Sequence, residues 1–222
     1  MTVDDVWWRL GEMATLQRRH NEQVHPRWAA QGHEYYRAVW VECAELLDHF
    51  GWKWWKRQDS DLDQVRLEVV DIWHFGLSEL LRGEQLNRAL AGRLQAALTD
   101  PDSTVPDFRL AVEELARTCL ASKGFDIGAF AALMRALPMT FDELYETYVA
   151  KNVLNAFRQD HGYRTGHYIK IWDGREDNEH LTEILRGLDP RAESFATDLG
   201  AALAARYAGL VGKNADAGAA GT

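Results

Sequence analysis

Apolar residues recur every three or four positions along most of the chain, which is the spacing of one face of an α-helix. No stretch alternates apolar and polar residues as a half-buried strand does. All the prolines fall between the periodic stretches, where helices tolerate them. The sequence therefore predicts an all-α fold without strands. The expected helices cover residues 3–22, 33–50, 61–82, 84–99, 106–122, 126–136, 140–160, 176–187 and 190–211.

The end of the chain differs from the rest. Residues 212–222 are small and polar, which predicts a disordered tail after a single helical domain over residues 1–211. Within that domain, Thr140 followed by Glu143 is typical of a capping box that begins a helix.

Acidic residues interrupt two of the oily stretches at the same spacing. Glu42 and Glu45 lie in a stretch that is apolar on almost every side, which predicts a buried helix. Glu68 and Asp71 repeat the three-residue spacing in the next expected helix, which is again apolar around them. Buried carboxylates must be paired or bind a metal, because burying the bare charge costs several kcal/mol. If the two helices pack side by side, four carboxylates converge, and such all-oxygen ligation favours Mg²⁺, with Mn²⁺ as a substitute.

A second polar constellation lies further along the chain. Lys151, Asn155 and Arg158 share one stripe of an expected helix. Two glycines then interrupt the helical pattern, and Lys170 follows them. We interpret this segment as a mobile flap that closes on an anion. Together with metal ions at the acids, these cations suit a polyphosphate that is neutralised from both sides.

Amides and tryptophans provide a third set of candidates. Gln17 and Asn21 lie four residues apart on one helix face, and amides offer the donors and acceptors that reading a pyrimidine edge requires. The segment "GWKWWK" supplies Trp52, Trp54 and Trp55. We expect one of these rings to stack on a base and the other two to lie in the core.

Composition excludes several classes of function. The formal net charge of −9 argues against general nucleic-acid binding, which uses a basic surface. No segment approaches the roughly 18 apolar residues of a membrane span, and the first residues lack the features of a signal peptide. Cys43 and Cys119 lack metal-binding spacing, and we expect buried free thiols. These features together predict a cytoplasmic protein without membrane or nucleic-acid partners.

With these motifs the chain resembles the dimeric, all-α dUTP diphosphatases (dUTPases), a branch of the all-α NTP pyrophosphatases that include the MazG proteins. The two acid pairs, spaced ExxE and ExxD, mark the wider group. The dUTPase branch is indicated by "WKWWK" (52–56), "DIWHF" (71–75) and the segment from "KNVLNAFRQDHGY" to "REDN" (151–178). The resemblance covers roughly residues 10–180.

The resemblance implies a fold and an activity. The fold is a helical bundle of the NTP pyrophosphatase type, with a rigid core and a mobile helical cap, assembled as a homodimer. The activity is hydrolysis of dUTP to dUMP and pyrophosphate by a Mg²⁺-bound water that attacks the β-phosphorus. It keeps uracil out of DNA and supplies dUMP for thymidylate synthesis, and dUDP is a further candidate substrate.

The resemblance also assigns roles to single residues. The implied metal ligands are Glu42, Glu45, Glu68 and Asp71. The implied phosphate-binding residues are Lys151, Asn155, Arg158 and Lys170. The implied base- and sugar-binding residues are Gln17, Asn21, Trp54, His74, Phe75 and Asn178, with Asp71 also near the sugar. Our candidate general base is Glu42, with Glu45 as its rival. The chain departs from the family pattern at "LQRRHNEQ", where the insert Arg18–His20 precedes Asn21.

Three alternatives remain open at the level of sequence. A related pyrophosphatase would prefer dCTP or another nucleotide. A non-nucleotide di-metal carboxylate bundle, such as a di-iron protein, would need Glu-x-x-His on two helices, and only Asp71-x-x-His74 comes close. A helical interaction protein without enzymatic activity would have no use for buried acids.

Overall fold

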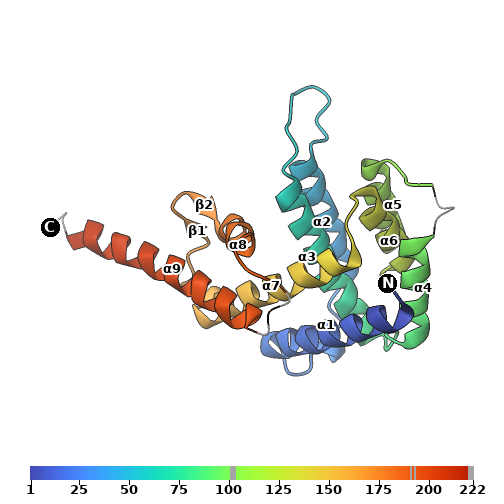
Figure 1. The fold of residues 1–222 in the computed structure, drawn as a ribbon, viewed down its shortest axis with the longest axis horizontal. Coiled ribbons are helices and arrows are strands. Elements are labelled where there is room, and N and C mark those ends of the chain that lie inside the picture. Colours follow the sequence, from blue (N-terminus) through green and yellow to red (C-terminus); the bar gives the residue numbers. More distant parts are fainter. Residues whose placement is uncertain (101–103, 191, 193, 220–222) are drawn as a thin grey trace. The chain divides into compact units, whose positions relative to one another are not determined.

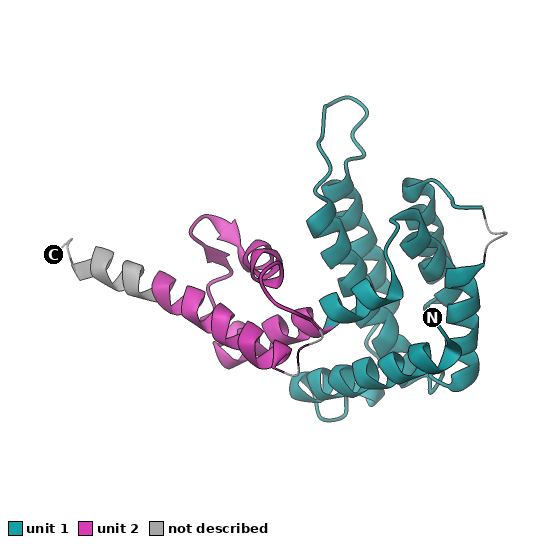
Figure 2. Cartoon of the chain, in the orientation of Figure 1, with its two compact units in different colours: residues 1–148 teal, residues 149–222 magenta. Residues whose placement is uncertain are grey.

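The computed structural model describes residues 1–100, 104–190, 192 and 194–219, with side chains as far as residue 210 (Figure 1). The chain divides into two compact units, residues 1–148 and 149–222 (Figure 2). The boundary falls within one helix, α7 (Phe141–Asp160). A single domain over residues 1–211 therefore stays a prediction, and each unit is described in turn below.

Unit 1 is built from helices that follow the predicted order. Its elements are α1 (Val3–Val24), the short 3₁₀ helix η1 (Trp28–Ala30), α2 (Tyr35–Phe50), α3 (Leu62–Arg82), α4 (Arg88–Thr99), α5 (Phe108–Ser122), α6 (Ile127–Ala136) and the start of α7. The helices lie where the 3.6-residue periodicity predicted them, which confirms the all-α fold class.

Local capping explains where two of these helices begin. The main-chain N–H of Glu143 donates to Thr140 Oγ1 at 3.1 Å, and the N–H of Thr140 donates to Glu143 Oε2 at 2.7 Å, which confirms the predicted capping box. Helix α4 begins later than the pattern predicted. The side chain of Asn87 accepts from the N–H of Leu90 at 3.0 Å and so fixes the first turn there.

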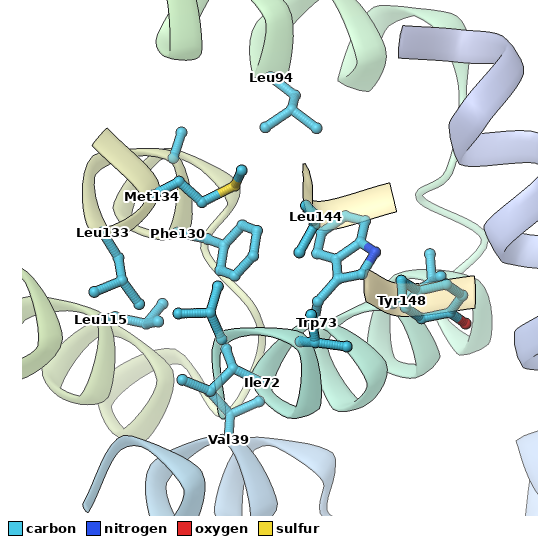
Figure 3. Packing of buried hydrophobic residues seen from close by; sticks show 14 of the residues in the cluster. Val39, Ile72, Trp73, Leu94, Leu115, Phe130, Leu133, Met134, Leu144 and Tyr148 are labelled. Atoms are coloured by element: carbon cyan, nitrogen blue, oxygen red, sulfur yellow. The ribbon is translucent and has the colours of Figure 1, made fainter. Parts of the chain in front are cut away.

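Trp73 lies at the centre of the core of unit 1. Helix α2 packs against α3 and α5, while α4 packs against α1 and α6. Trp73 stacks on Phe130, with ring centroids 5.1 Å apart (Figure 3). The ring of Phe125 meets Trp73 edge to face at a centroid distance of 6.0 Å. A Cβ atom at Gly76 would lie 2.5 Å from the ring of Phe125, so only glycine leaves room for this ring against α3.

Helices α2 and α3 differ in burial, and one prediction is wrong here. Helix α3 is buried along most of its length, as predicted. Helix α2 is not, because its packing against α3 and α5 covers only one side. Trp40 and Val41 are 44% and 42% exposed, and Glu45 is exposed as well. The oily composition of α2 thus reflects an exposed apolar surface in addition to a core face.

Unit 2 contains the end of α7, η2 (Tyr163–Thr165), the strands β1 (Ile171–Trp172) and β2 (Arg175–Glu176), α8 (Asp177–Leu185) and α9 (Phe195–Ala219). The expectation of no strands is wrong, since β1 and β2 form an antiparallel hairpin. Asp173 and Gly174 join them with positive φ angles of 47° and 83°, as a two-residue hairpin turn requires. Strands of two residues are too short to show an alternating pattern.

Aromatic rings hold the elements of unit 2 together. Tyr168 stacks on Tyr207 of α9 at a centroid distance of 5.4 Å, and Phe157 of α7 meets the edge of Tyr207 at 5.5 Å. Trp172 of the hairpin lies 5.5 Å from the same ring. Tyr207 therefore contacts three separate segments and fixes the loop that precedes α8.

The last helix reaches into the segment that was predicted to be disordered. Helix α9 includes residues 212–219, and residues 220–222, the rest of that tail, lie outside the described residues. Among the residues that the structure describes, no helix has the length and apolar character needed to cross a membrane.

Candidate functional site

Three acidic side chains converge between α2 and α3 in unit 1. Glu42 of α2 and Glu68 and Asp71 of α3 each place a carboxylate oxygen within 4.8 Å of the other two. Within the described residues this is the one group of acid, histidine and cysteine side chains close enough to share an ion. The structure thus brings together three of the four acids that the sequence singled out. We call this group the acid cluster.

Electrostatics in the acid cluster oppose ionisation. Burial, the charge of Asp71 and a hydrogen bond with Glu68 raise the pKa of Glu42 to about 9. The cluster therefore holds a proton that a divalent cation would displace. Three hard oxygen ligands from two packed helices fit Mg²⁺ or Mn²⁺ in chemistry and charge.

The two other acids of α2 lie outside the acid cluster. Glu45 is exposed, although its charge also contributes to the raised pKa of Glu42. Asp48 is exposed and accepts from Lys53 Nζ at 2.7 Å and from Trp52 Nε1 at 3.0 Å. Asp48 thus ties the following loop to the helix.

A buried network of polar side chains lies between α1, α3 and α7 in unit 1. Gln17 Nε2 donates to Asn21 Oδ1 at 3.0 Å, and Asn21 Nδ2 donates to Ser78 Oγ at 3.0 Å. Gln17 Oε1 lies 2.8 Å from His74 Nδ1 and accepts from the Tyr148 hydroxyl at 2.6 Å. The rings of His74 and Tyr148 stack with centroids 4.3 Å apart. We call these five residues the amide network. It contains Gln17, Asn21 and His74, three of the predicted base- and sugar-binding residues.

The surroundings of the amide network are also polar. His20 of α1 lies with its ring centroid 6.5 Å from that of His74, and burial lowers the pKa of His20. Phe75, the neighbour of His74 on α3, is half-buried against the core cluster. Polar groups on this scale are costly inside an apolar core, so such a cluster is a candidate for binding rather than for packing.

The tryptophans of the loop between α2 and α3 lie on the surface, which corrects the prediction that two of them belong to the core. Trp54 is 90% exposed, and Trp52 and Trp55 are 46% and 57% exposed. This loop projects beyond both helices (Figure 1). The rings instead pack edge to face on one another, with Trp55 at 5.2 Å from Trp52 and 5.5 Å from Trp54. The role of Trp54 at a base stays a prediction.

Most of the predicted phosphate-binding residues meet in unit 2, around a buried acid. Arg158 donates from Nε and from NH2 to the two carboxylate oxygens of Asp177, both at 2.8 Å. Arg158 also donates to Asn155 Oδ1 at 3.1 Å and to Asn178 Oδ1 at 3.2 Å. Lys151, only 2% exposed, donates to Asn178 Oδ1 at 3.0 Å. We call these five residues the cationic cluster.

Asp177 is the charge partner at the centre of the cationic cluster. It is fully buried and also accepts from the Tyr168 hydroxyl at 2.7 Å. Burial acts to raise its pKa, but the hydrogen bonds and the charge of Arg158 outweigh it and lower the pKa of Asp177. Lys170 is apart from this group, since it is exposed and pairs with Glu176 at 2.8 Å.

Sequence reasoning missed Ser78, Tyr148 and Asp177 as members of these clusters. Ser78 lies one helical turn after His74, so the i, i+4 rule could have found it. Asp177 belongs to the quoted segment "REDN", but no spacing rule pairs it with Arg158. Tyr148 comes from a distant helix, and no local signal connects it to Gln17.

The fold and the acid cluster together define an all-α protein with a site suited to a divalent cation. The sequence profile of the dUTPase family matches residues 9–163. The chain therefore belongs to the all-α dUTPase family, and this membership implies dUTP diphosphatase activity. No curated protein sequence shows significant similarity to the chain. Members of this family generally use a divalent metal, and the acid cluster offers a place for one.

Proposed function

We propose that the chain hydrolyses dUTP to dUMP and pyrophosphate, with Mg²⁺, or Mn²⁺ as a substitute, held by Glu42, Glu68 and Asp71. The observation that carries the proposal is the approach of the three carboxylates to within 4.8 Å in a chain of the dUTPase family. The product dUMP would supply thymidylate synthesis, and removal of dUTP would keep uracil out of DNA.

When bound, Mg²⁺ neutralises phosphate charge and lowers the pKa of water toward neutrality. Once the cation has displaced its own proton, Glu42 would be a carboxylate that can take the proton of the attacking water. A new oxygen–phosphorus bond forms at the β-phosphorus while the bond to the oxygen bridging the α- and β-phosphorus breaks. That oxygen leaves with dUMP. Glu45, exposed beside Glu42, remains the rival for the base and the fourth candidate ligand.

The other binding roles belong to the same proposal. Two cations, an amide and the exposed Lys170 would donate to phosphate oxygens, and charge-assisted hydrogen bonds of this kind are the strong ones. The residues in this role are Lys151, Asn155, Arg158 and Lys170. The residues proposed to contact the base and the sugar are Gln17, Asn21, Trp54, His74, Phe75 and Asn178.

The proposal includes a homodimer in a reducing, cytoplasmic compartment. Trp40 and Val41 on the exposed side of α2 offer apolar surface for a second copy. Cys43 and Cys119 are buried free thiols, as is usual for proteins of reducing compartments.

Pyrophosphate release tests the proposed reaction directly. We expect release from dUTP in the presence of Mg²⁺ and its loss when EDTA removes the ion. The panel should contain dUTP, dCTP, dTTP, dATP and dGTP, each at the same concentration and with the same enzyme preparation, while dUDP is assayed by orthophosphate release because its hydrolysis to dUMP yields no pyrophosphate. Preference for dCTP would contradict the substrate, and full activity in EDTA would contradict the role of the acid cluster.

A further inference from the structure

The hydrogen bonds of the amide network run in one order from donor to acceptor, and a main-chain carbonyl fixes that order. Ser78 Oγ donates to the carbonyl oxygen of His74 at 2.9 Å, and a carbonyl can only accept. Because the single hydroxyl hydrogen of Ser78 is used there, its oxygen accepts from Asn21 at 3.0 Å, and the group that faces it is Nδ2. The orientation of the Asn21 amide follows from this one bond.

The direction then passes to the second amide. With Nδ2 turned to Ser78, Asn21 presents Oδ1 to Gln17, which donates from Nε2 at 3.0 Å. Gln17 Oε1 consequently faces the Tyr148 hydroxyl at 2.6 Å and His74 Nδ1 at 2.8 Å. The Tyr148 hydroxyl has one hydrogen and two acceptors in reach, Gln17 Oε1 at 2.6 Å and the carbonyl oxygen of Met13 at 3.1 Å, and the shorter bond is the one to Gln17. Since Oε1 can only accept, His74 carries a hydrogen on Nδ1 in this orientation. The Ser78 end therefore requires this orientation of the two amides, and the 2.6 Å bond from Tyr148 favours it.

The donor and acceptor groups that the two amides still offer follow one another in a fixed order. Of the hydrogen bonds that the structure describes, one on Gln17 Nε2 and one on Asn21 Nδ2 each use a single hydrogen and leave a second N–H. Asn21 Oδ1 lies between these two groups and accepts well from Gln17 alone. Its other neighbour, Ser78 Oγ, lies 3.4 Å away and gives its hydrogen to His74. The two amides thus present donor, acceptor and donor in sequence.

This order matches one pyrimidine and mismatches another. Uracil presents O2, N3–H and O4, which are acceptor, donor and acceptor, and each meets its complement. Cytosine presents O2, N3 and an amino group, so its N3 lone pair would face Asn21 Oδ1 and its amino group would face an N–H. Buried polar groups left without their complement cost enough to reject a substrate.

We propose that Ser78 and Tyr148 are positioning residues that select uracil over cytosine by fixing the direction of the Gln17 and Asn21 amides. The proposal rests on the proposed function, in which these two amides read the base. Thymine presents the same hydrogen-bonding edge as uracil, so the network does not separate dUTP from dTTP. The proposal therefore predicts that loss of the network changes the preference for dUTP over dCTP and leaves the preference for dUTP over dTTP unchanged.

The test uses Ser78→Ala and Tyr148→Phe in the full-length chain. Each change removes one hydroxyl and keeps nearly the same side-chain volume, and Tyr148→Phe keeps the ring on His74. The matched controls are Ser122→Ala and Tyr145→Phe. Ser122 Oγ makes the same kind of bond to the carbonyl four residues earlier, at 2.7 Å, on the distant helix α5. Tyr145 lies on α7, the helix of Tyr148, and its ring packs on Trp8.

The measured quantity is kcat/KM for dUTP, dCTP and dTTP. We expect the dUTP to dCTP ratio to fall about tenfold in each of the two network variants, the scale of one misplaced buried polar group. The loss should arise mainly through KM for dUTP, with the dUTP to dTTP ratio unchanged. The two controls should keep both ratios of the unmodified chain.

Other outcomes separate this proposal from the proposed function. If the unmodified chain hydrolyses dUTP and both variants keep the dUTP to dCTP ratio, the network is only structural and the positioning role is wrong. An equal loss on all three substrates, accompanied by a lower melting temperature, has the same meaning. If the unmodified chain hydrolyses no nucleotide, the proposed function itself fails. Should one variant not fold, the other decides alone.

Discussion

The acid cluster of unit 1, which is partly buried, and the largely buried cationic cluster of unit 2 both gather charged side chains, but their electrostatics are opposite. In the acid cluster, like charges approach one another, and the pKa of Glu42 rises to about 9. In the cationic cluster, Arg158 grips Asp177 with two hydrogen bonds of 2.8 Å, and the pKa of Asp177 falls. The acid cluster thus contains carboxyl groups without enough positive charge beside them, whereas in the cationic cluster Arg158 neutralises the charge of Asp177.

This difference predicts different responses of the two clusters to an approaching ion. The fold holds the carboxylates of the acid cluster close together, and a bound cation reduces the repulsion between them. This relief adds to the affinity for the cation. An anion that approaches the cationic cluster must compete with Asp177 for Arg158. The two clusters should therefore respond in opposite ways to mutation, metal and pH.

The largest expected effect is on stability and comes from breaking the balanced pair. Arg158→Met leaves the carboxylate of Asp177 buried without its main counter-charge, and we expect the free energy of unfolding to fall by about 3–5 kcal/mol. Thermal and urea unfolding followed by circular dichroism measure it. Arg117→Met is the control, because its pair with Glu114 is exposed and should contribute little to stability. Equal, small losses in both variants would mean that Asp177 does not depend on Arg158.

The next effect is on catalysis and comes from removing one acid of the repelling group. We expect Glu68→Gln to lower kcat for dUTP by at least about 100-fold, the usual scale for groups that act directly in such reactions. Without metal, the same variant should be at least as stable as the unmodified chain, because one repelling charge is gone. Pyrophosphate release and melting temperatures in EDTA test both parts. Glu114→Gln, an exposed acid on α5, is the control. Near-normal turnover of Glu68→Gln would remove the acid cluster from the mechanism.

The smallest expected effect is a pH-dependent response to Mg²⁺. The pKa of Glu42 is raised from 4.5 to about 9, so its stabilising proton is fully present below 4.5 and is lost as the pH rises through about 9. Asp177, with a lowered pKa, behaves in the opposite way: its contribution is present above 3.8 and is lost as the pH falls through its folded value. Added Mg²⁺ should therefore raise the melting temperature by more degrees near pH 9 than near pH 5, since fewer molecules then carry the competing proton on Glu42.

Scanning calorimetry with EDTA and with Mg²⁺ at the two pH values measures this response. In Glu42→Gln the difference between the two pH values should disappear, while in Asp177→Asn it should persist. A Mg²⁺ effect that is the same at both pH values in the unmodified chain would contradict the raised pKa of Glu42 as its origin.

The sequence predicted the helices well because their signal is periodic and local. Apolar spacing located the helices, and Thr140 with Glu143 marked a start. It also predicted that the acid pairs of two helices would converge if these helices pack side by side, and three of the four acids do so. What it could not predict was burial, which depends on neighbours. Trp40 and Trp54 are of a residue type that is common in protein cores, yet both lie on the surface.

The polar clusters show the same limit at the level of single residues. Gln17 and Asn21 were found because they share one helix face. Their partner Tyr148 was not found, since more than a hundred residues of chain separate it from Gln17. The pairing of Arg158 with Asp177 likewise depends on the hairpin of β1 and β2, whose strands are too short to leave a pattern.

Gly76 adds a consequence for any mutational scan of α3. It lies two residues from His74 and two from Ser78, so a scan that found it intolerant of substitution would place it among the nucleotide-binding positions. Yet a glycine offers no side chain to a ligand, and its intolerance would report the space that the ring of Phe125 occupies. On this helix, sensitivity to substitution does not by itself indicate contact with substrate, because residues two positions apart are constrained for different reasons.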